Sequence, residues 1–178
     1  MKLNKLLVAT SFALALPVAT IAAPTVTFQG EVTDQTCKAT VNGQTDSTVL
    51  LPTVPVTELS ASGMKTGLTP FTISIQDCQP ASTSLDISTK FLGHNVTSNG
   101  NLGNLATANP AENVSIQLTA NADGTNPVAL NGITSVPGLV LEANATSATH
   151  QFGAQYYAED VATAGAVTAV AEYTLSYN

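Results

Sequence analysis

Arginine and tryptophan are absent from this sequence of 178 residues, and charged residues make up only 10% of it. Five lysines against twelve acidic residues give a net charge of −7. Nucleic-acid binding needs clustered basic side chains that neutralise phosphates, so this class of partner is excluded. The absence of tryptophan also weakens the case for a site at which a sugar stacks on a ring.

Long apolar runs are also scarce, and the exception lies at the start. A basic stretch at residues 1–5 precedes an apolar stretch at 6–16, and small residues follow up to Ala22 and Ala23. This pattern predicts a secretory signal peptide over residues 1–22, too short in its apolar part to anchor in a membrane. No later run approaches 18 apolar residues, so we expect no transmembrane anchor. About 156 residues remain, enough for one domain, with a net charge near −9 once Lys2 and Lys5 are removed.

Cysteine occurs twice, as Cys37 and Cys78. In an oxidising compartment an even pair predicts one disulfide, here closing a loop of about 40 residues that contributes on the order of 4 kcal/mol. A metal site needs further ligands close by, and neither cysteine has a histidine near it in sequence. We therefore expect a disulfide and no metal.

Alternation with a period of two dominates the rest of the chain. It recurs at residues 71–75, 85–91, 114–118 and 152–156, with shorter apolar pieces at 49–51 and 139–141. Turn-rich stretches such as 98–101, 122–127 and 131–132 separate these runs. Short strands at this spacing predict an all-β, antiparallel sandwich, with one helical turn near residues 56–62.

Two terminal segments have the same alternating pattern. In residues 25–32, one face of the strand carries Val26, Phe28, Gly30 and Val32. Such a run fits an ordinary first strand, but a glycine in the middle of an apolar face weakens a strand that belongs to its own sheet. Gly30 suits a strand that enters a partner's groove where that groove is narrow.

The tail follows Gly165, which interrupts the preceding pattern. From there Val167, Ala169, Ala171, Tyr173, Leu175 and Tyr177 share one strand face. A last strand of an ordinary domain fits this alternation too, although most domains fray at their ends.

The other polar residues give weaker signals. His94 and His150 have no metal-ligand company in sequence, which predicts surface or loop positions. The pair Glu159 and Asp160 predicts a solvated turn, in preference to an acid–base pair of an enzyme. No nucleophile motif, phosphate-binding loop or cofactor fingerprint is present, so we expect neither catalysis nor a cofactor.

Together these features resemble the major pilins of chaperone–usher fimbriae, the type 1 and P pilus subunits of Gram-negative bacteria. The resemblance rests on TVTFQGEV ahead of Cys37, on PFTISIQDC ending at Cys78, on Gly165 as the fourteenth residue from the end, and on the penultimate Tyr177. The closing stretch FGAQYYAEDVATAGAVTAVAEYTLSYN is similar as well. Within that family the sequence resembles the branch of the uroepithelial-cell-adhesin type major pilins.

The resemblance implies an incomplete immunoglobulin-like sandwich that lacks its last strand. Residues 23–34 would then be a donor-strand extension and residues 35–178 the pilin domain. Tyr173, Leu175 and Tyr177, preceded by Gly165, would border the groove of the missing strand. Val26, Phe28 and Val32 would enter the groove of a neighbouring subunit, with Gly30 at its tight position.

The partners that the resemblance implies are a periplasmic chaperone, an outer-membrane usher and identical or homologous pilin subunits. The expected function is that of a structural subunit, secreted through the periplasm to the cell surface and polymerised by donor-strand exchange, in a fimbria that supports cell adhesion. The alternatives are a fimbrial adhesin that binds host-cell glycans directly, or a minor adaptor or terminator subunit.

Overall fold

The computed structural model describes residues 30–177. The chain divides into residues 1–30 and 31–178, and Gly30 alone is described in the first of these units. In the second unit one 3-10 turn, η1 (Val56–Leu59), accompanies eight strands. The strands are β1 (Lys38–Val41), β2 (Lys65–Gln76), β3 (Leu85–Gly93), β4 (Leu102–Gly103), β5 (Val114–Thr119), β6 (Thr134–Leu141), β7 (Ala148–Ala158) and β8 (Ala171–Tyr177).

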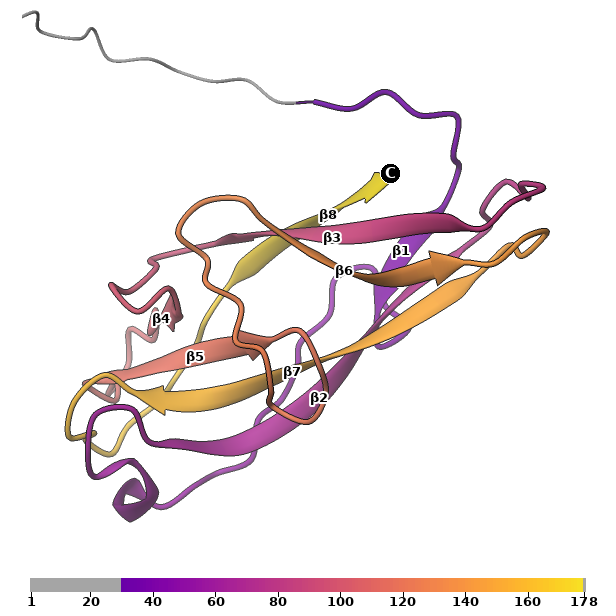
Figure 1. Cartoon of the computed structure of the whole chain (residues 1–178). Helices are drawn as coiled ribbons and strands as arrows, with labels where there is room; N and C mark the ends of the chain where they lie inside the picture. The colour runs from indigo at the N-terminus through magenta and orange to yellow at the C-terminus, as the bar shows by residue number, and fades with distance from the viewer. Residues whose placement is uncertain (1–29, 178) are drawn as a thin grey trace, which may run out of the picture. The chain divides into compact units, whose positions relative to one another are not determined.

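The strands form two antiparallel sheets that enclose one main core. The larger sheet has the order β1-β2-β7-β5-β4, and the smaller has the order β6-β3-β8 (Figure 1). This arrangement confirms the predicted all-β sandwich. Among residues 30–177, β1 is one edge strand of the larger sheet and β8 is one edge strand of the smaller.

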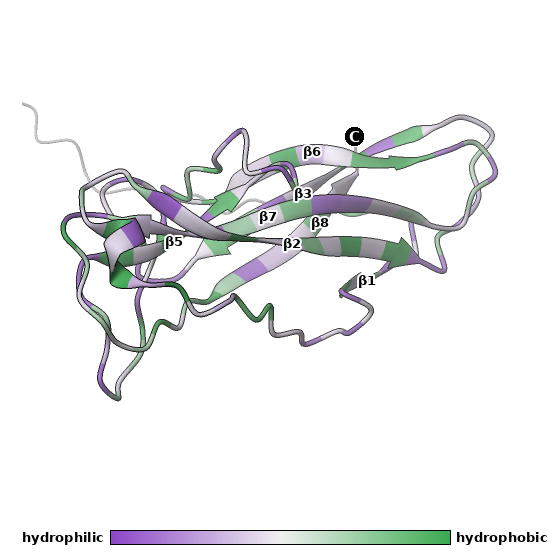
Figure 2. Ribbon diagram, turned by 90° about the horizontal axis from the view of Figure 1, so that it is seen from below, coloured by the Kyte–Doolittle hydropathy of each residue, from purple (hydrophilic) through white to green (hydrophobic). Residues whose placement is uncertain are grey.

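Period-two alternation explains which side chains enter the core. In β2, Phe71, Ile73 and Ile75 are buried while the residues between them are more exposed. The bands along this strand in Figure 2 show the matching alternation of hydropathy. Phe71 pairs across the ladder with Phe152 of β7, and their rings stack at 5.5 Å. Phe91 of β3 meets Phe152 edge-on at 5.3 Å, so aromatic packing joins the two sheets.

Some local predictions hold and others change. The helical turn expected near residues 56–62 is present as η1. Residues 49–51 form no strand, although Val49 and Leu51 still pack against the core while Leu50 lies 85% exposed. The tail strand starts at Ala171 and not at Val167, because residues 166–170 bond to loop residues in place of a strand: the Leu105 N–H donates to the Thr168 carbonyl.

The predicted surface or loop position of His150 holds only in part, because the residue lies in a strand and is half-buried. It belongs to β7, its ring stands edge-on to Phe152 at 4.6 Å, and its Nε2 lies 2.8 Å from the Ala120 carbonyl oxygen. The ring also covers Gly138 of β6, where an added Cβ would approach it to 2.5 Å. His150 therefore fills space between the sheets. His94 is exposed as predicted and pairs with Glu172 at 2.9 Å.

Glu159 and Asp160 lie in a bend directly after β7 and Asp160 is exposed, as predicted, but Glu159 is only half-exposed and hydrogen-bonded. Its carboxylate accepts hydrogen bonds from Thr97, Asn99, Asn101 and Ser115. Partial burial by itself would raise the pKa of Glu159, but the four hydrogen bonds stabilise the charged carboxylate more strongly, so its pKa lies below the usual value. The side chain thus holds the 97–101 loop onto β5.

No helix in residues 30–177 is long and apolar enough to cross a membrane.

Candidate functional site

The outer edge of β8 is the first component of the site. Within the described residues β8 has β3 as its sheet neighbour, with Leu175 opposite Thr89 and Tyr173 opposite Phe91. Peptide groups alternate in direction along a strand. The Val170 carbonyl accepts from the His94 N–H on the β3 side, whereas the Tyr177 N–H points away from β3 and donates to Glu31. The odd-numbered residues therefore present their N–H and C=O groups to the open edge.

The side chains of these odd-numbered residues form an apolar row beside that edge. All six members of the predicted face are partly buried against the main core: Val167, Ala169, Ala171, Tyr173, Leu175 and Tyr177. Burial raises the pKa of the Tyr173 and Tyr177 phenols, with smaller contributions from Asp46 and Glu31 respectively. The row is half-covered, and a further layer of side chains would complete its burial.

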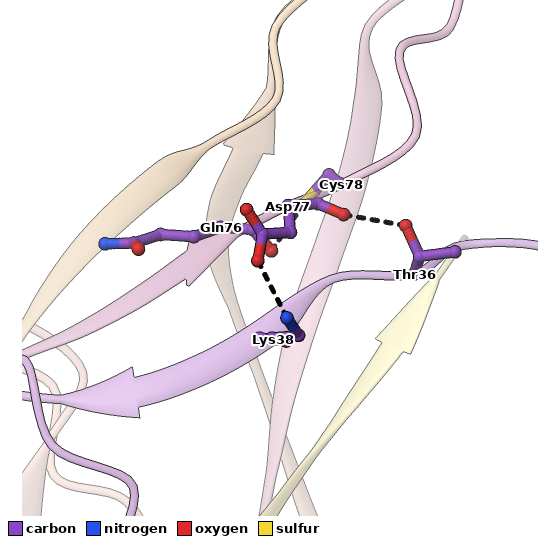
Figure 3. A network of polar contacts seen from close by, with 5 residues as sticks. All are labelled: Thr36, Lys38, Gln76, Asp77 and Cys78. Atoms are coloured by element: carbon purple, nitrogen blue, oxygen red, sulfur yellow. Dashed lines mark hydrogen bonds and ion pairs between the residues drawn. The ribbon is translucent and has the colours of Figure 1, made fainter.

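The opposite wall is β1, which is fixed to the end of β2. Cys37 and Cys78 form the predicted disulfide. Figure 3 shows the polar contacts around it: the Thr36 hydroxyl donates to the Asp77 carbonyl at 2.7 Å, and Lys38 pairs with the Asp77 carboxylate at 3.0 Å. Both members of that ion pair are exposed and contribute little, so the backbone ladder to β2 and the disulfide just ahead of the strand hold β1 in place.

An open pocket of about 400 Å³ lies between the two walls. Its lining comes from β1, from β8 and from the segment that precedes β1: Glu31, Thr33, Cys37, Ala39, Tyr173, Thr174, Leu175 and Tyr177. The pocket therefore separates the edge strands of the two sheets. An extended segment laid along it would reach both the open edge of β8 and the apolar row.

A second cavity, of about 420 Å³, lies where the tail begins. Residues 162–167 line it together with η1 and parts of β5 and β7. Gly165 is in this lining, ahead of β8 and outside the strand. A Cβ on Gly165 would lie 2.4 Å from the Ala111 nitrogen and 2.6 Å from the Asn109 carbonyl oxygen. Gly165 thus permits a close approach of two backbone segments ahead of β8.

The predicted donor residues are only partly described. Val26 and Phe28 lie outside the described residues. Gly30 and Val32 are exposed and belong to no strand, and nothing lies within 4 Å of a Cβ built on Gly30. The roles of these four residues remain predictions.

Sequence reasoning missed Glu31 and the β1 wall. Glu31 contacts Ser176 and Tyr177, which lie 145 and 146 residues further along the chain, and Ala39 lines the same pocket as β8. No local pattern marks either residue, since both positions depend on how the two sheets assemble. A lone acid on the polar face of an alternating run has no distinguishing signature.

Residues 26–178 match the family described as fimbrial protein, and the chain belongs to this family. The F17 fimbrial protein of Escherichia coli is 40% identical over 85% of this chain and 86% of its own length. The major fimbrial subunit SMF-1 of Stenotrophomonas maltophilia is 37% identical over 92% of this chain and 98% of its own. The P pilus rod subunit PapA shares the fold, with a TM-score of 0.58 at 16% identity over 79% of this chain and 99% of that one.

These findings confirm the predicted family. The protein is a structural subunit of a bacterial surface fimbria, and it polymerises with other pilin subunits. Its sandwich is that of a pilin, in which β8 borders an open groove.

Proposed function

We propose that this protein is the major shaft subunit of its fimbria, joined head to tail by strand addition. The extension of one subunit enters the groove of the next and pairs with the open edge of β8. The observation that carries this proposal is the coincidence of three features at one place: a strand edge without a neighbouring strand among residues 30–177, a half-buried apolar row and an open pocket beside both.

The extension has the chemistry that such a groove requires. Its backbone would complete the ladder along β8 at about 1 kcal/mol per hydrogen bond, while alternate side chains fill the row. Burial of Val26, Phe28 and Val32 would contribute roughly 4–9 kcal/mol, at about 1.5–3 kcal/mol each. Gly30, between Phe28 and Val32, would leave room where the walls come closest.

The geometry of this contact produces a filament. The extension and the groove are different surfaces of the same subunit, so each contact leaves one free extension and one free groove. Contacts of this kind build a chain of unlimited length unless the rotation between successive subunits closes the chain into a ring. Residues 1–22 would direct secretion, residues 23–34 would be the donor extension and residues 35–178 the acceptor domain.

The open edge of β8 also gives a chaperone and an usher a role in assembly. An exposed strand edge beside apolar side chains is an aggregation hazard in a concentrated compartment. A periplasmic chaperone that lends a strand to β8 would remove the hazard, and an outer-membrane usher would exchange that strand for an extension.

The relatives favour a shaft role while leaving a second role open. The major subunit SMF-1 is matched over 98% of its length, whereas the minor subunit HifD of Haemophilus influenzae is matched over 73%. A relative of 31% identity is named laminin-binding fimbrial subunit ElfA, which supports direct adhesion as the second candidate. Electron microscopy and a host-cell binding assay on cells that lack this gene distinguish the two roles. Loss of filaments supports the shaft role, and intact filaments that no longer bind host cells support adhesion.

Two complementary variants test strand addition. Phe28→Glu puts a charge on the extension and leaves the groove intact, and Leu175→Glu puts a charge in the groove and leaves the extension intact. Neither purified variant should polymerise alone. Mixed together, they should form dimers and stop, because the first supplies only a groove and the second only an extension.

Size-exclusion chromatography with light scattering measures the outcome. Val170→Glu serves as the control, because this substitution adds the same charge outside the apolar row. Val170 lies just ahead of β8 and is 43% exposed. Polymers of wild-type length from both single variants would refute the assignment of extension and groove.

A further inference from the structure

Glu31 belongs to the segment ahead of β1, yet its carboxylate contacts the end of the chain. Its Oε2 accepts a hydrogen bond from the Ser176 hydroxyl at 2.7 Å, and its Oε1 accepts one from the Tyr177 N–H at 2.9 Å. Ser176 is buried and Glu31 is exposed, so the fixed partner is β8 and the movable partner is Glu31.

The contact uses a donor that an incoming strand needs. Tyr177 is the last residue of β8, and its N–H points away from β3 toward the open edge. A strand that pairs along the whole of this edge must bind the same N–H, which can satisfy one strong acceptor at a time. Glu31 and the incoming strand therefore compete for the Tyr177 N–H.

Electrostatics favour the contact in the empty subunit. The Ser176 hydroxyl, and next the Tyr177 N–H, hold the pKa of the Glu31 carboxyl below its usual value despite slight burial, and the charge of Lys90 on β3 adds to this effect. Glu31 is accordingly ionised at neutral pH. Hydrogen bonds to a charged acceptor are stronger than those between neutral groups.

We propose that Glu31 is a latch on the acceptor edge: its carboxylate occupies the Tyr177 N–H until an incoming strand replaces it. The inference rests on the proposed strand addition and adds a regulatory step to it. Glu31 lies at the base of the subunit's own extension. Filling of the groove thus releases the extension that must enter the next subunit.

The latch links the two ends of one subunit. If groove filling breaks the Glu31 contact, then breaking that contact must favour groove filling by the same free energy. A subunit that has received a strand becomes a better donor than an empty one. Growth at an occupied end of the filament is then favoured over association of free subunits.

The test uses the mature chain, residues 23–178, carrying Phe28→Glu so that it keeps its groove and cannot donate. The probe is a fluorescent synthetic peptide of residues 23–34 with the wild-type sequence. Four further substitutions are compared in this background: Glu31→Ala, Glu31→Gln, Ser176→Ala and, as a control, Asp34→Asn. The control removes the same charge three residues along the same segment.

Glu31→Ala should take up the peptide several-fold faster than the background chain. Ser176→Ala and Glu31→Gln should lie between, since each retains part of the contact, and Asp34→Asn should match the background. Hydrogen exchange of the Tyr177 amide, followed by NMR without peptide, should be faster in Glu31→Ala than in the background.

Equal uptake rates in all variants would overturn the latch while leaving strand addition intact. A background chain that takes up no peptide would overturn the proposed function itself. The latch would fall with it, and hydrogen exchange would then decide only the contact itself: an unchanged Tyr177 exchange rate in Glu31→Ala would refute the hydrogen bond to Glu31.

Discussion

Loss of the Cys37–Cys78 disulfide should destabilise the domain and disorganise one wall of the groove. The bond joins residues 41 apart in sequence, and a loop of this length corresponds to about 4 kcal/mol of restricted unfolded-state entropy. Domains of this size have free energies of unfolding of roughly 5–15 kcal/mol. The double substitution Cys37→Ala with Cys78→Ala should therefore remove a large share of the stability.

Urea denaturation of the mature chain measures this effect. We expect the midpoint to fall and the slope of the free energy against urea to rise, because an unfolded chain without the cross-link exposes more surface. Thr36→Ala is the matched control, since it removes only an exposed hydrogen bond to the Asp77 carbonyl beside the same disulfide. Its effect should stay within about 1 kcal/mol.

The functional readout of the same variant is uptake of a donor peptide. The ladder to β2 remains without the disulfide, but Cys37 and the segment ahead of β1, which line the pocket, lose their covalent link and should be held less firmly beside β8. Peptide binding should weaken more than in the Thr36→Ala control. Stability within about 1 kcal/mol of wild type, together with unchanged peptide uptake, would refute this account of the disulfide.

Three further perturbations follow from the packing. Gly165→Ala should cost about 1–3 kcal/mol in urea denaturation, because the new Cβ would meet backbone atoms of residues 109–111. Phe152→Ala should cost about 3–5 kcal/mol, read as a lower midpoint of thermal unfolding, because this ring joins both sheets. The pKa of Glu159 is lowered in the folded state, so its ionised carboxylate stabilises the fold at neutral pH, and this contribution is lost as the pH falls through the folded-state pKa. Glu159→Gln should therefore reduce the loss of stability on the acid side of a curve of unfolding free energy against pH.

The local pattern of the chain predicted its strands well. The runs at 71–75, 85–91, 114–118 and 152–156 all lie within strands. All six apolar residues of the tail pack against the main core, although only the four from Ala171 onward belong to β8. The pleat of a strand places alternate side chains on opposite faces whatever its neighbours are, so alternation in sequence is enough to identify the face.

Contacts between distant segments were not predictable in this way. Glu159 collects donors from the 97–101 loop and from β5, and His150 is enclosed by residues of three different segments. Both had the sequence surroundings of exposed polar residues. Their partial burial depends on partners up to 62 residues away, and those partners are set by the sheet order.

The sequence by itself determined the amphipathic strands, the disulfide-forming pair and the resemblance of both ends to those of a pilin. Only the tertiary structure decided that β8 and β1 are the edges of their sheets, that a pocket separates them and that Glu31 reaches the Tyr177 N–H. The physical reason is that the apolar face of a strand is a property of its own residues. Whether its edge is paired or open is a property of the order in which distant strands assemble.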